Sequence, residues 1–151
     1  MTAWRIGDPA GRFPVWSAEG ARLAKGRWHE AGAAVIYAAE YFSTAMLEKL
    51  AHANGVMPPN QHSLKITLPA GLSYEVVNAH KIPGWDSRDG EAARLFGRSW
   101  YREKRSATLF VPSVVARGER NLVINADHPD FAKIKTSLET PVAWDLRLFT
   151  T

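Results

Sequence analysis

The stretch AAVIYAAEYFSTAMLEKLAHAN, residues 33–54, decides the fold because two periodicities meet within it. Residues 33–38 are apolar with a β-branched centre, which predicts a buried strand. From residue 43 to residue 54 the apolar side chains fall at helical spacing, and Ser43 or Thr44 is the expected N-cap. A strand that leads directly into an amphipathic helix predicts a mixed α and β domain.

The remaining elements follow from alternation and from turn residues on either side of that stretch. Residues 8–26 are rich in turn formers, and no repeat or linker divides the chain, which predicts one domain over residues 1–151. The predicted class is α+β, with a mostly antiparallel β core and flanking helices. Strands are expected at residues 3–7, 107–115, 121–125 and 142–149, a hairpin at 63–68 and 72–77 around Pro69-Ala70-Gly71, and helices at 90–105 and near 130–134.

Composition limits the class of protein. A chain of 151 residues, 46% of them hydrophobic, is long enough to bury one core. The absence of cysteine excludes disulfides and thiolate zinc sites. No apolar run approaches 18 residues and no secretory signal is visible, so we expect a soluble, cytoplasmic protein without a membrane span. A net charge of +4 favours anionic partners, although no nucleic-acid recognition motif accompanies the scattered basic residues.

Two charged residues are candidates for a functional site. Arg27 follows a glycine and precedes Trp28, so its planar guanidinium could bind a phosphate or could stack on the indole. Glu48 lies beside the apolar face of the predicted helix, where an ionised carboxylate is costly without a partner or a function. His52 is one turn later on the same face. This pair alone supplies too few ligands for a metal site, and simple pairing of Glu48 with lysines remains an alternative.

An aromatic residue and a hydroxyl complete the set. Tyr37 closes the first buried strand, and Ser113 follows Pro112 at the end of another apolar run. Their structural alternatives are a core aromatic and a turn or cap residue. A nucleophilic serine is disfavoured because Gly-x-Ser-x-Gly is absent. Taken together, a fixed cation, an aromatic platform, a carboxylate and a hydroxyl suit a site that cleaves an anionic, sugar-containing nucleotide.

Short segments in a fixed order carry a family resemblance. They are Trp4-Arg5, Gly26-Arg27-Trp28, Val35-Ile36-Tyr37, Thr44 to Glu48 with His52, Leu109 to Ser113, Asn121 to Pro129, and Trp144 to Leu148. In this order they resemble the RES-domain toxins, a family named for an arginine, a glutamate and a serine. The matching positions are Arg27, Glu48 and Ser113 as catalytic residues, and Arg5, Tyr37, Trp28 and His52 as substrate-binding residues. Residues 17–25 are too irregular to align.

The resemblance implies a fold similar to ADP-ribosyltransferases and an activity that consumes NAD as a substrate, with no bound cofactor or metal. Water, inorganic phosphate as a co-substrate, or a protein side chain would accept the ADP-ribose, and the sequence leaves these three open. It also implies the toxin half of a bacterial type II pair, with an Xre-like helix-turn-helix antitoxin that blocks the pocket. DNA would then be contacted only through the antitoxin, no membrane is involved, and a homodimer within the complex is one expected arrangement.

Two other classes of function compete with this interpretation. A toxin that binds or cleaves nucleic acid would use the basic surface, and its binding would weaken steeply with salt. A non-catalytic interaction module would hold a partner on the apolar surface around Trp85, Trp100 and Tyr101. Such a module would be indifferent to Glu48→Ala.

Overall fold

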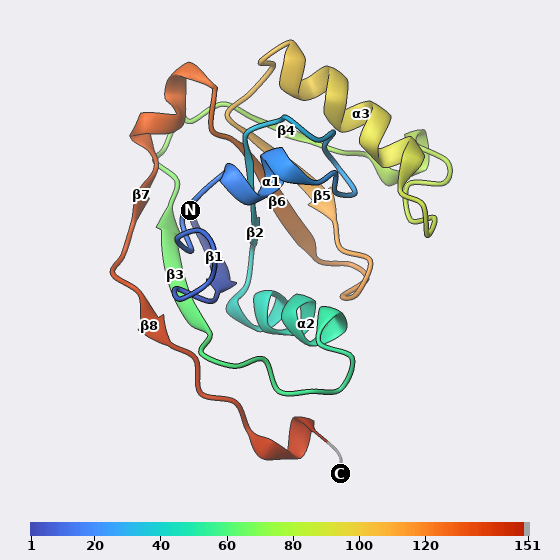
Figure 1. The fold of residues 1–151 in the computed structure, drawn as a ribbon. Coiled ribbons are helices and arrows are strands. Elements are labelled where there is room, and N and C mark those ends of the chain that lie inside the picture. The colour runs from blue at the N-terminus through green and yellow to red at the C-terminus, as the bar shows by residue number, and fades with distance from the viewer. Residues whose placement is uncertain (150–151) are drawn as a thin grey trace.

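The computed structural model describes residues 1–149, which form an eight-stranded sheet with flanking helices (Figure 1). This arrangement confirms the α+β class. The elements are β1 (Thr2–Gly7), α1 (Glu19–Leu23), β2 (Val35–Ala39), α2 (Phe42–His52), β3 (His62–Thr67), β4 (Tyr74–Val76), the 3₁₀ turn η1 (Ala79–Lys81), α3 (Glu91–Arg102), β5 (Thr108–Pro112), β6 (Arg120–Asn125), η2 (Pro129–Lys133), β7 (Lys135–Thr136), β8 (Thr140–Pro141) and η3 (Leu146–Leu148).

The sheet is mostly antiparallel, as predicted. Its strand order is β4-β5-β6-β2-β1-β3-β7, with β8 also paired to β3. Only the β4–β5 pair is parallel among the strand pairs of residues 1–149. The centre is β2 against β6, where Tyr37 lies opposite Val123 and Ala39 opposite Asn121. Two strands that are distant in sequence therefore meet in the middle of the sheet.

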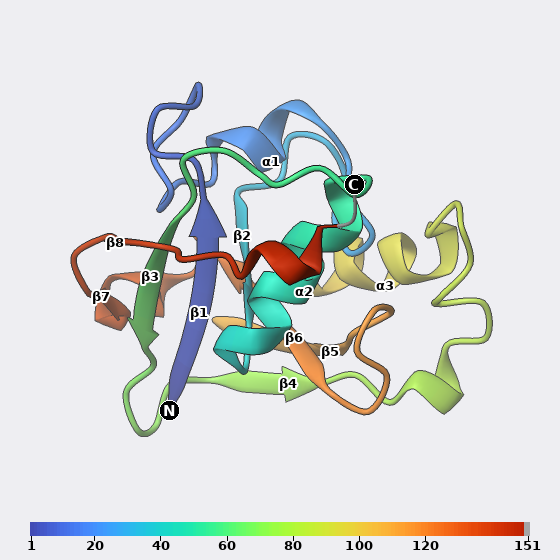
Figure 2. The same cartoon turned by 90° about the horizontal axis from the view of Figure 1, so that it is seen from below.

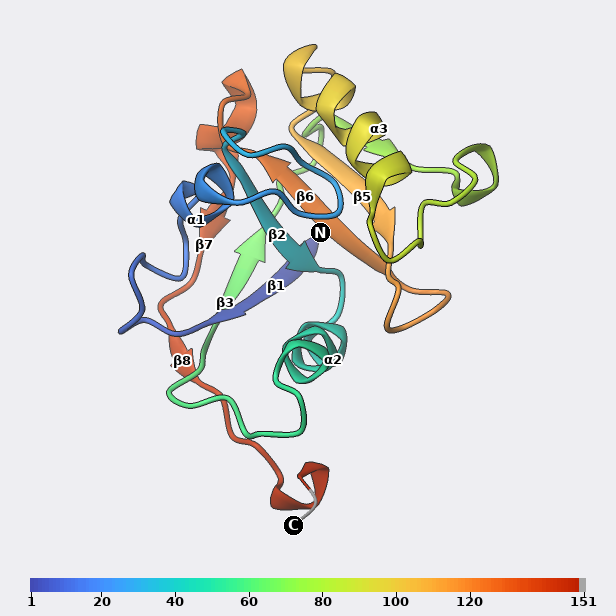
Figure 3. The same cartoon turned by 45° about the vertical axis from the view of Figure 1, so that its right-hand side comes forward.

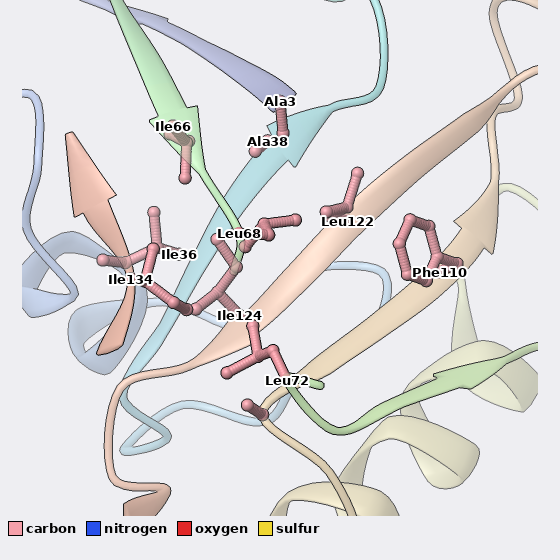
Figure 4. Packing of buried hydrophobic residues seen from close by; sticks show 11 residues of the cluster. Ala3, Ile36, Ala38, Ile66, Leu68, Leu72, Phe110, Leu122, Ile124 and Ile134 are labelled. Carbon is pink, nitrogen blue, oxygen red and sulfur yellow. The ribbon is translucent and has the colours of Figure 1, made fainter. Parts of the chain in front are cut away.

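The central strands are apolar on both faces because both faces are covered. Ile36 of β2 and Phe110 of β5 point into one cluster, which also contains Ile66 and Ile134 (Figure 4). Their neighbours in sequence, such as Val35 and Leu109, point into a second cluster beneath α3. This alternation is what a pleated strand imposes, and burial on both sides explains why β2 and β5 are continuous apolar runs.

Helix α3 covers β5 and β6 on one side of the sheet (Figure 3). It buries Ala93, Gly97 and Trp100, which are spaced four and three residues apart and therefore share one helical face. Gly97 permits an unusually close approach, because a Cβ atom built there would lie 1.8 Å from the carbonyl oxygen of Trp28. The loop that carries Trp28 and Arg27 is thereby pressed against the helix.

Helix α2 lies at another part of the sheet, beside β1 and β2 (Figures 2 and 3). Its apolar residues Phe42, Ala45 and Met46 pack with residues of β1 and β2 and with Val142 from the segment after β8. The predicted cap is wrong, because the helix begins at Phe42 and its N-cap position, Tyr41, makes no side-chain capping bond. Thr44 instead donates its hydroxyl hydrogen to the carboxylate of Glu119.

The hairpin predicted for residues 63–77 is also wrong. β3 pairs with β1 over six residue pairs, from Thr2 opposite Thr67 to Gly7 opposite His62. β4 pairs instead with β5, in parallel. The turn residues do reverse the chain locally, but Leu68 and Leu72 on either side are both drawn into the same apolar cluster, so the chain crosses to the far edge of the sheet. Alternation shows that a strand exists and does not reveal its partner.

Two further differences lie near the ends. A short helix, α1, forms inside the stretch that we predicted to consist of turns. The strand predicted for residues 142–149 is absent from the described part of that stretch, which contains η3 and is joined to the loop before β3 by a bond from the Val142 amide to the Gln61 carbonyl. The strand at 107–115 is shorter than expected, whereas those at 3–7 and 121–125 and the helix at 90–105 are confirmed. No helix among residues 1–149 is long and apolar enough to cross a bilayer.

We predict that Gly97→Ala lowers the free energy of unfolding by about 3 kcal/mol or more, because the new methyl group would overlap the Trp28 carbonyl. Urea denaturation measures the change. Gly20→Ala in α1 is the matched control, because its Cβ would meet only Phe13 at 3.8 Å, an ordinary contact. Equal stability of the two variants would show that α3 is free to move away from the loop.

Candidate functional site

A cleft of about 710 Å³ opens where α2, the ends of β1, β2 and β5, and the loop around residue 27 converge. Of the seven residues predicted for the site, six line this cleft: Arg5, Arg27, Trp28, Tyr37, Glu48 and His52. The seventh, Ser113, lies directly behind it. The sequence segments that suggested a site are therefore brought together, although they come from different parts of the chain.

Glu48 projects from α2 and is half-buried at the cleft wall. One of its carboxylate oxygens, Oε1, accepts two hydrogen bonds, from Ser113 Oγ at 2.9 Å and from Asn121 Nδ2 at 2.8 Å. The other oxygen, Oε2, has no hydrogen-bond partner within residues 1–149. Two donors on one oxygen fix the orientation of the carboxylate and leave its second oxygen for a ligand.

Ser113 is 1% exposed and follows directly after β5. Its hydroxyl group donates to Glu48 and accepts a hydrogen bond from the Ala116 amide at 2.9 Å, while its own amide donates to the Glu119 carbonyl. The hydroxyl hydrogen is therefore used by Glu48. The bonds to Ala116 and Glu119 show the turn role that was the structural alternative for Ser113, and its catalytic role stays a prediction.

Arg27 does not stack on Trp28. Its Nη1 donates to the carbonyl oxygens of Trp85 at 2.9 Å and Ser87 at 2.7 Å, which ties the loop before α3 to the cleft. The guanidinium stacked on a tryptophan is that of Arg117, 5.3 Å from the ring centre of Trp85. Because Nη1 makes both of these bonds, Nη2 and Nε of Arg27 remain for an anion in the cleft.

Trp28 is 2% exposed, with its indole stacked on that of Trp85 at 6.4 Å between ring centres. It forms part of the cleft floor and anchors the loop that carries Arg27. His52 lies at the exposed end of α2, and its Nδ1 bonds the Glu48 carbonyl oxygen at 2.8 Å. A role for either residue in binding substrate stays a prediction. No group of three acidic or histidine side chains within residues 1–149 could hold a metal.

Tyr37 belongs to a short hydrogen-bonded chain below the cleft. The imidazole Nε2 of His29 lies 3.0 and 2.9 Å from the carbonyl oxygens of Ala21 and Ala24, so Nε2 carries the hydrogen. Nδ1 is then the acceptor for the Tyr37 hydroxyl at 2.7 Å, and that hydroxyl accepts the Trp28 amide at 3.1 Å. Burial raises the pKa of Tyr37 above its ordinary value, so the phenol keeps its proton.

Gly26 is required by the same arrangement. A Cβ atom at this position would lie 2.6 Å from Cε1 of His29 and 2.9 Å from the Tyr37 hydroxyl. Its carbonyl oxygen accepts a bond from Nε of Arg94 on α3 at 2.9 Å. The glycine before Arg27 therefore lets the loop lie close to the tyrosine, instead of supplying only a flexible turn.

Arg5 lies at the base of the cleft and holds two segments together. Its Nε donates to the Val15 carbonyl at 2.6 Å and its Nη1 to the Tyr37 carbonyl at 2.8 Å. Burial lowers the pKa of Arg5 to about 10, so the guanidinium stays charged at neutral pH. Its positive charge is not paired with a carboxylate among the ion pairs of residues 1–149.

Three residues near the site were not predicted as site residues. Asn121 belongs to a segment that carries the resemblance, but its position beside Glu48 becomes visible only in the structure, where it is the second residue of β6. Lys49 lies next to Glu48 and lines the same cleft, but lysines on helices are common and usually solvated. His29 is 4% exposed, and nothing in its neighbours predicted a bond to Tyr37. These partners are set by tertiary packing.

The fold and the cleft define an α+β protein with a fixed carboxylate facing a cationic pocket. Residues 2–145 match the model of the RES domain family. The chain belongs to this family, and the resemblance drawn from the sequence is confirmed.

Relatives cover nearly the whole chain. It is 37% identical over 152 residues to a Sphingobium protein named Prs ADP-ribosylating toxin, a match that spans 96% of this chain and 94% of that protein. It is 34% identical to a Pseudomonas putida protein named Toxin Res, over 99% of this chain and 100% of the relative. The M. tuberculosis MbcT–MbcA toxin–antitoxin complex contains a chain of similar fold, with a TM-score of 0.70 and 17% identity over 93% of this chain and 83% of that one.

We predict that Tyr37→Phe lowers the free energy of unfolding by about 1–3 kcal/mol, because the Trp28 amide and His29 Nδ1 each lose a partner in a buried setting. Urea denaturation at neutral pH tests this. Tyr41→Phe is the control, since Tyr41 is 54% exposed. If both variants unfold at the wild-type midpoint, the hydrogen-bonded chain does not stabilise the fold.

Proposed function

We propose that this chain is the toxin of a toxin–antitoxin pair and that it breaks the nicotinamide–ribose bond of NAD in the cytoplasm. The observation that carries the proposal is the Glu48 carboxylate, held through Oε1 by Ser113 and Asn121 with Oε2 left free at the cleft. Membership of the RES domain family and the names of two relatives support the toxin assignment.

The chemistry of that bond suits a fixed carboxylate. As nicotinamide departs, positive charge develops on the ribose ring, and a preorganised negative oxygen stabilises this charge. Oε2 of Glu48 would also accept a hydrogen bond from the ribose 2′-hydroxyl, and this bond strengthens as charge develops. The nicotinamide of NAD is already cationic and leaves as a neutral base, so no side chain has to protonate it.

The residues that would bind the dinucleotide are Arg5, Arg27 and Tyr37, which line the cleft. The unoccupied donors of Arg5 and Arg27 would bind the pyrophosphate, because a guanidinium fork matches two phosphate oxygens. The ring of Tyr37 would pack against nicotinamide or its ribose. Ser113, whose hydroxyl hydrogen is used by Glu48, then acts as a positioning residue for that carboxylate.

Three acceptors fit the same bond cleavage, each with release of nicotinamide. Water yields ADP-ribose, inorganic phosphate yields ADP-ribose-1″-phosphate, and a protein side chain yields an ADP-ribosylated protein. The name of the Sphingobium relative favours a protein acceptor as the second candidate function. The partner in the cell would be an Xre-like helix-turn-helix antitoxin that blocks the cleft, and a homodimer within that complex stays a prediction.

We predict that Glu48→Gln lowers nicotinamide release by about 100-fold or more. A glutamine retains an oxygen for Ser113 and Asn121, so the fold survives while the negative charge is lost. Purified protein is incubated with NAD, with and without phosphate and with a bacterial lysate as a source of acceptor proteins, and the products are resolved by mass. Wild-type activity in a folded Glu48→Gln variant would contradict the proposed mechanism, and absence of all three products from the wild-type protein would contradict the proposed function.

The donors to Oε1 give a separate prediction. Ser113→Ala and Asn121→Ala each lower kcat by about 10-fold with little change in KM, because the carboxylate is present but poorly oriented. Asn121→Asp lowers kcat further, because it replaces one of the two donors to Oε1 with a second carboxylate that repels Glu48. Asn78→Asp, at an exposed position in a cap, is the control for the added charge. A wild-type kcat in Asn121→Asp would remove Asn121 from this role.

A further inference from the structure

A second cavity of about 380 Å³ adjoins the cleft on the side of residues 5–24. Four residues line both spaces: Arg5, Ile6, Tyr37 and Lys49. They form the boundary where the two cavities meet. Of these four, Arg5 and Lys49 carry charge, and both charges are positive. The boundary therefore carries two partly buried positive charges, and both side chains are accessible from either cavity.

Lys49 is half-buried, and its ammonium group has no hydrogen bond or ion pair with any of residues 1–149. Arg5 satisfies two of its donors with carbonyl oxygens, which fix its position but do not neutralise its charge. Arg5 and Lys49 both line the two cavities, so the two cations share this boundary, where burial and, next, the charge of Arg5 lower the pKa of Lys49. Two like charges held together away from bulk water destabilise the protein unless an anion joins them.

The acidic residue in the lining of the second cavity does not fill that role. Asp8 lines the second cavity and raises the pKa of Lys49, the weakest of the three influences on it. Its Oδ1 accepts bonds from the Ala10 amide at 2.8 Å and from Asn60 Nδ2 at 3.0 Å, so it stabilises the turn after β1. With Arg12 also in the lining, three positive side chains face one negative one.

We propose that Arg5 and Lys49 form a phosphoryl-binding subsite at the junction of the two cavities, with Lys49 as its principal free donor. The ammonium group supplies three N–H donors and Arg5 supplies its Nη2, which together suit the oxygens of a phosphate group. The subsite rests on the proposed function for its substrate, because the phosphoryl group would come either from the pyrophosphate of NAD or from free inorganic phosphate as acceptor. Lys49 is then a binding residue for the anion, adjacent in sequence to Glu48.

Binding is tested directly, without turnover. Calorimetric titration of the full chain with inorganic phosphate and, separately, with inorganic pyrophosphate is compared for wild type, Lys49→Met and Lys49→Arg. Lys65→Met is the matched control, because Lys65 is exposed on β3 and lines neither cavity. We expect Lys49→Met to weaken binding of at least one probe by about 10-fold or more, Lys49→Arg to retain most of it, and Lys65→Met to change neither.

The source of the phosphoryl group is separated by steady-state kinetics. If Lys49→Met has a higher KM for NAD than wild type in phosphate-free buffer, the subsite binds the pyrophosphate of NAD. If Lys49→Met has an unchanged KM for NAD and a higher KM for phosphate, the subsite binds the acceptor phosphate. Equal affinity of wild type and Lys49→Met for both anions overturns the subsite. Because the titrations need no reaction, anion binding that depends on Lys49 in a protein without NAD cleavage would overturn the proposed function and leave the subsite standing.

Discussion

The interaction on which the site depends is the pair of hydrogen bonds to Oε1 of Glu48. The glutamate belongs to α2, whereas its donors, Ser113 and Asn121, come from the β5–β6 unit. Helix α2 packs against β1 and β2 through Phe42, Ala45 and Met46, so the Glu48 carboxylate is a polar connection from this helix to the β5–β6 unit. An ionised group at a half-buried position is tolerated when charge-assisted bonds compensate for its lost hydration. The two hydrogen bonds to Oε1 of Glu48 also leave Oε2 as the carboxylate oxygen that is available to a ligand in the cleft.

The rest of the cleft follows the same pattern, in which polar groups position one another and leave selected atoms unused. Arg27 and Arg5 each donate hydrogen bonds to backbone carbonyl oxygens from part of the guanidinium group, and their other N–H groups can bind a ligand. Tyr37 keeps its proton and bonds His29, which immobilises the ring. Lys49 is the exception, because its ammonium group makes no hydrogen bond or ion pair with any of residues 1–149. Fixed donors and an unneutralised cation are expected where an anionic substrate completes the site.

Much of the fold and of the candidate site could be predicted from the sequence, and the predictions that were wrong have physical causes. Strand β2 was visible as a short apolar run with β-branched residues, and helices α2 and α3 were visible because each buries one face at helical spacing. The partner of β3 was not visible, since alternation is the same whichever strand lies beside it. The arginine, glutamate and serine could be named from their order along the chain. That Ser113 and Asn121 both donate to the Glu48 carboxylate could not be predicted, because each bond joins residues more than 60 positions apart.

The most direct test of the account is a crystal structure of the Glu48→Gln variant with NAD bound. The account predicts that the nicotinamide ribose lies within hydrogen-bond distance of the side chain at position 48, and that the pyrophosphate lies beside the guanidinium groups of the cleft. Residues 113 and 121 should keep their bonds to that side chain. A dinucleotide bound elsewhere, or one whose nicotinamide–ribose bond is remote from position 48, would contradict the central role of Glu48.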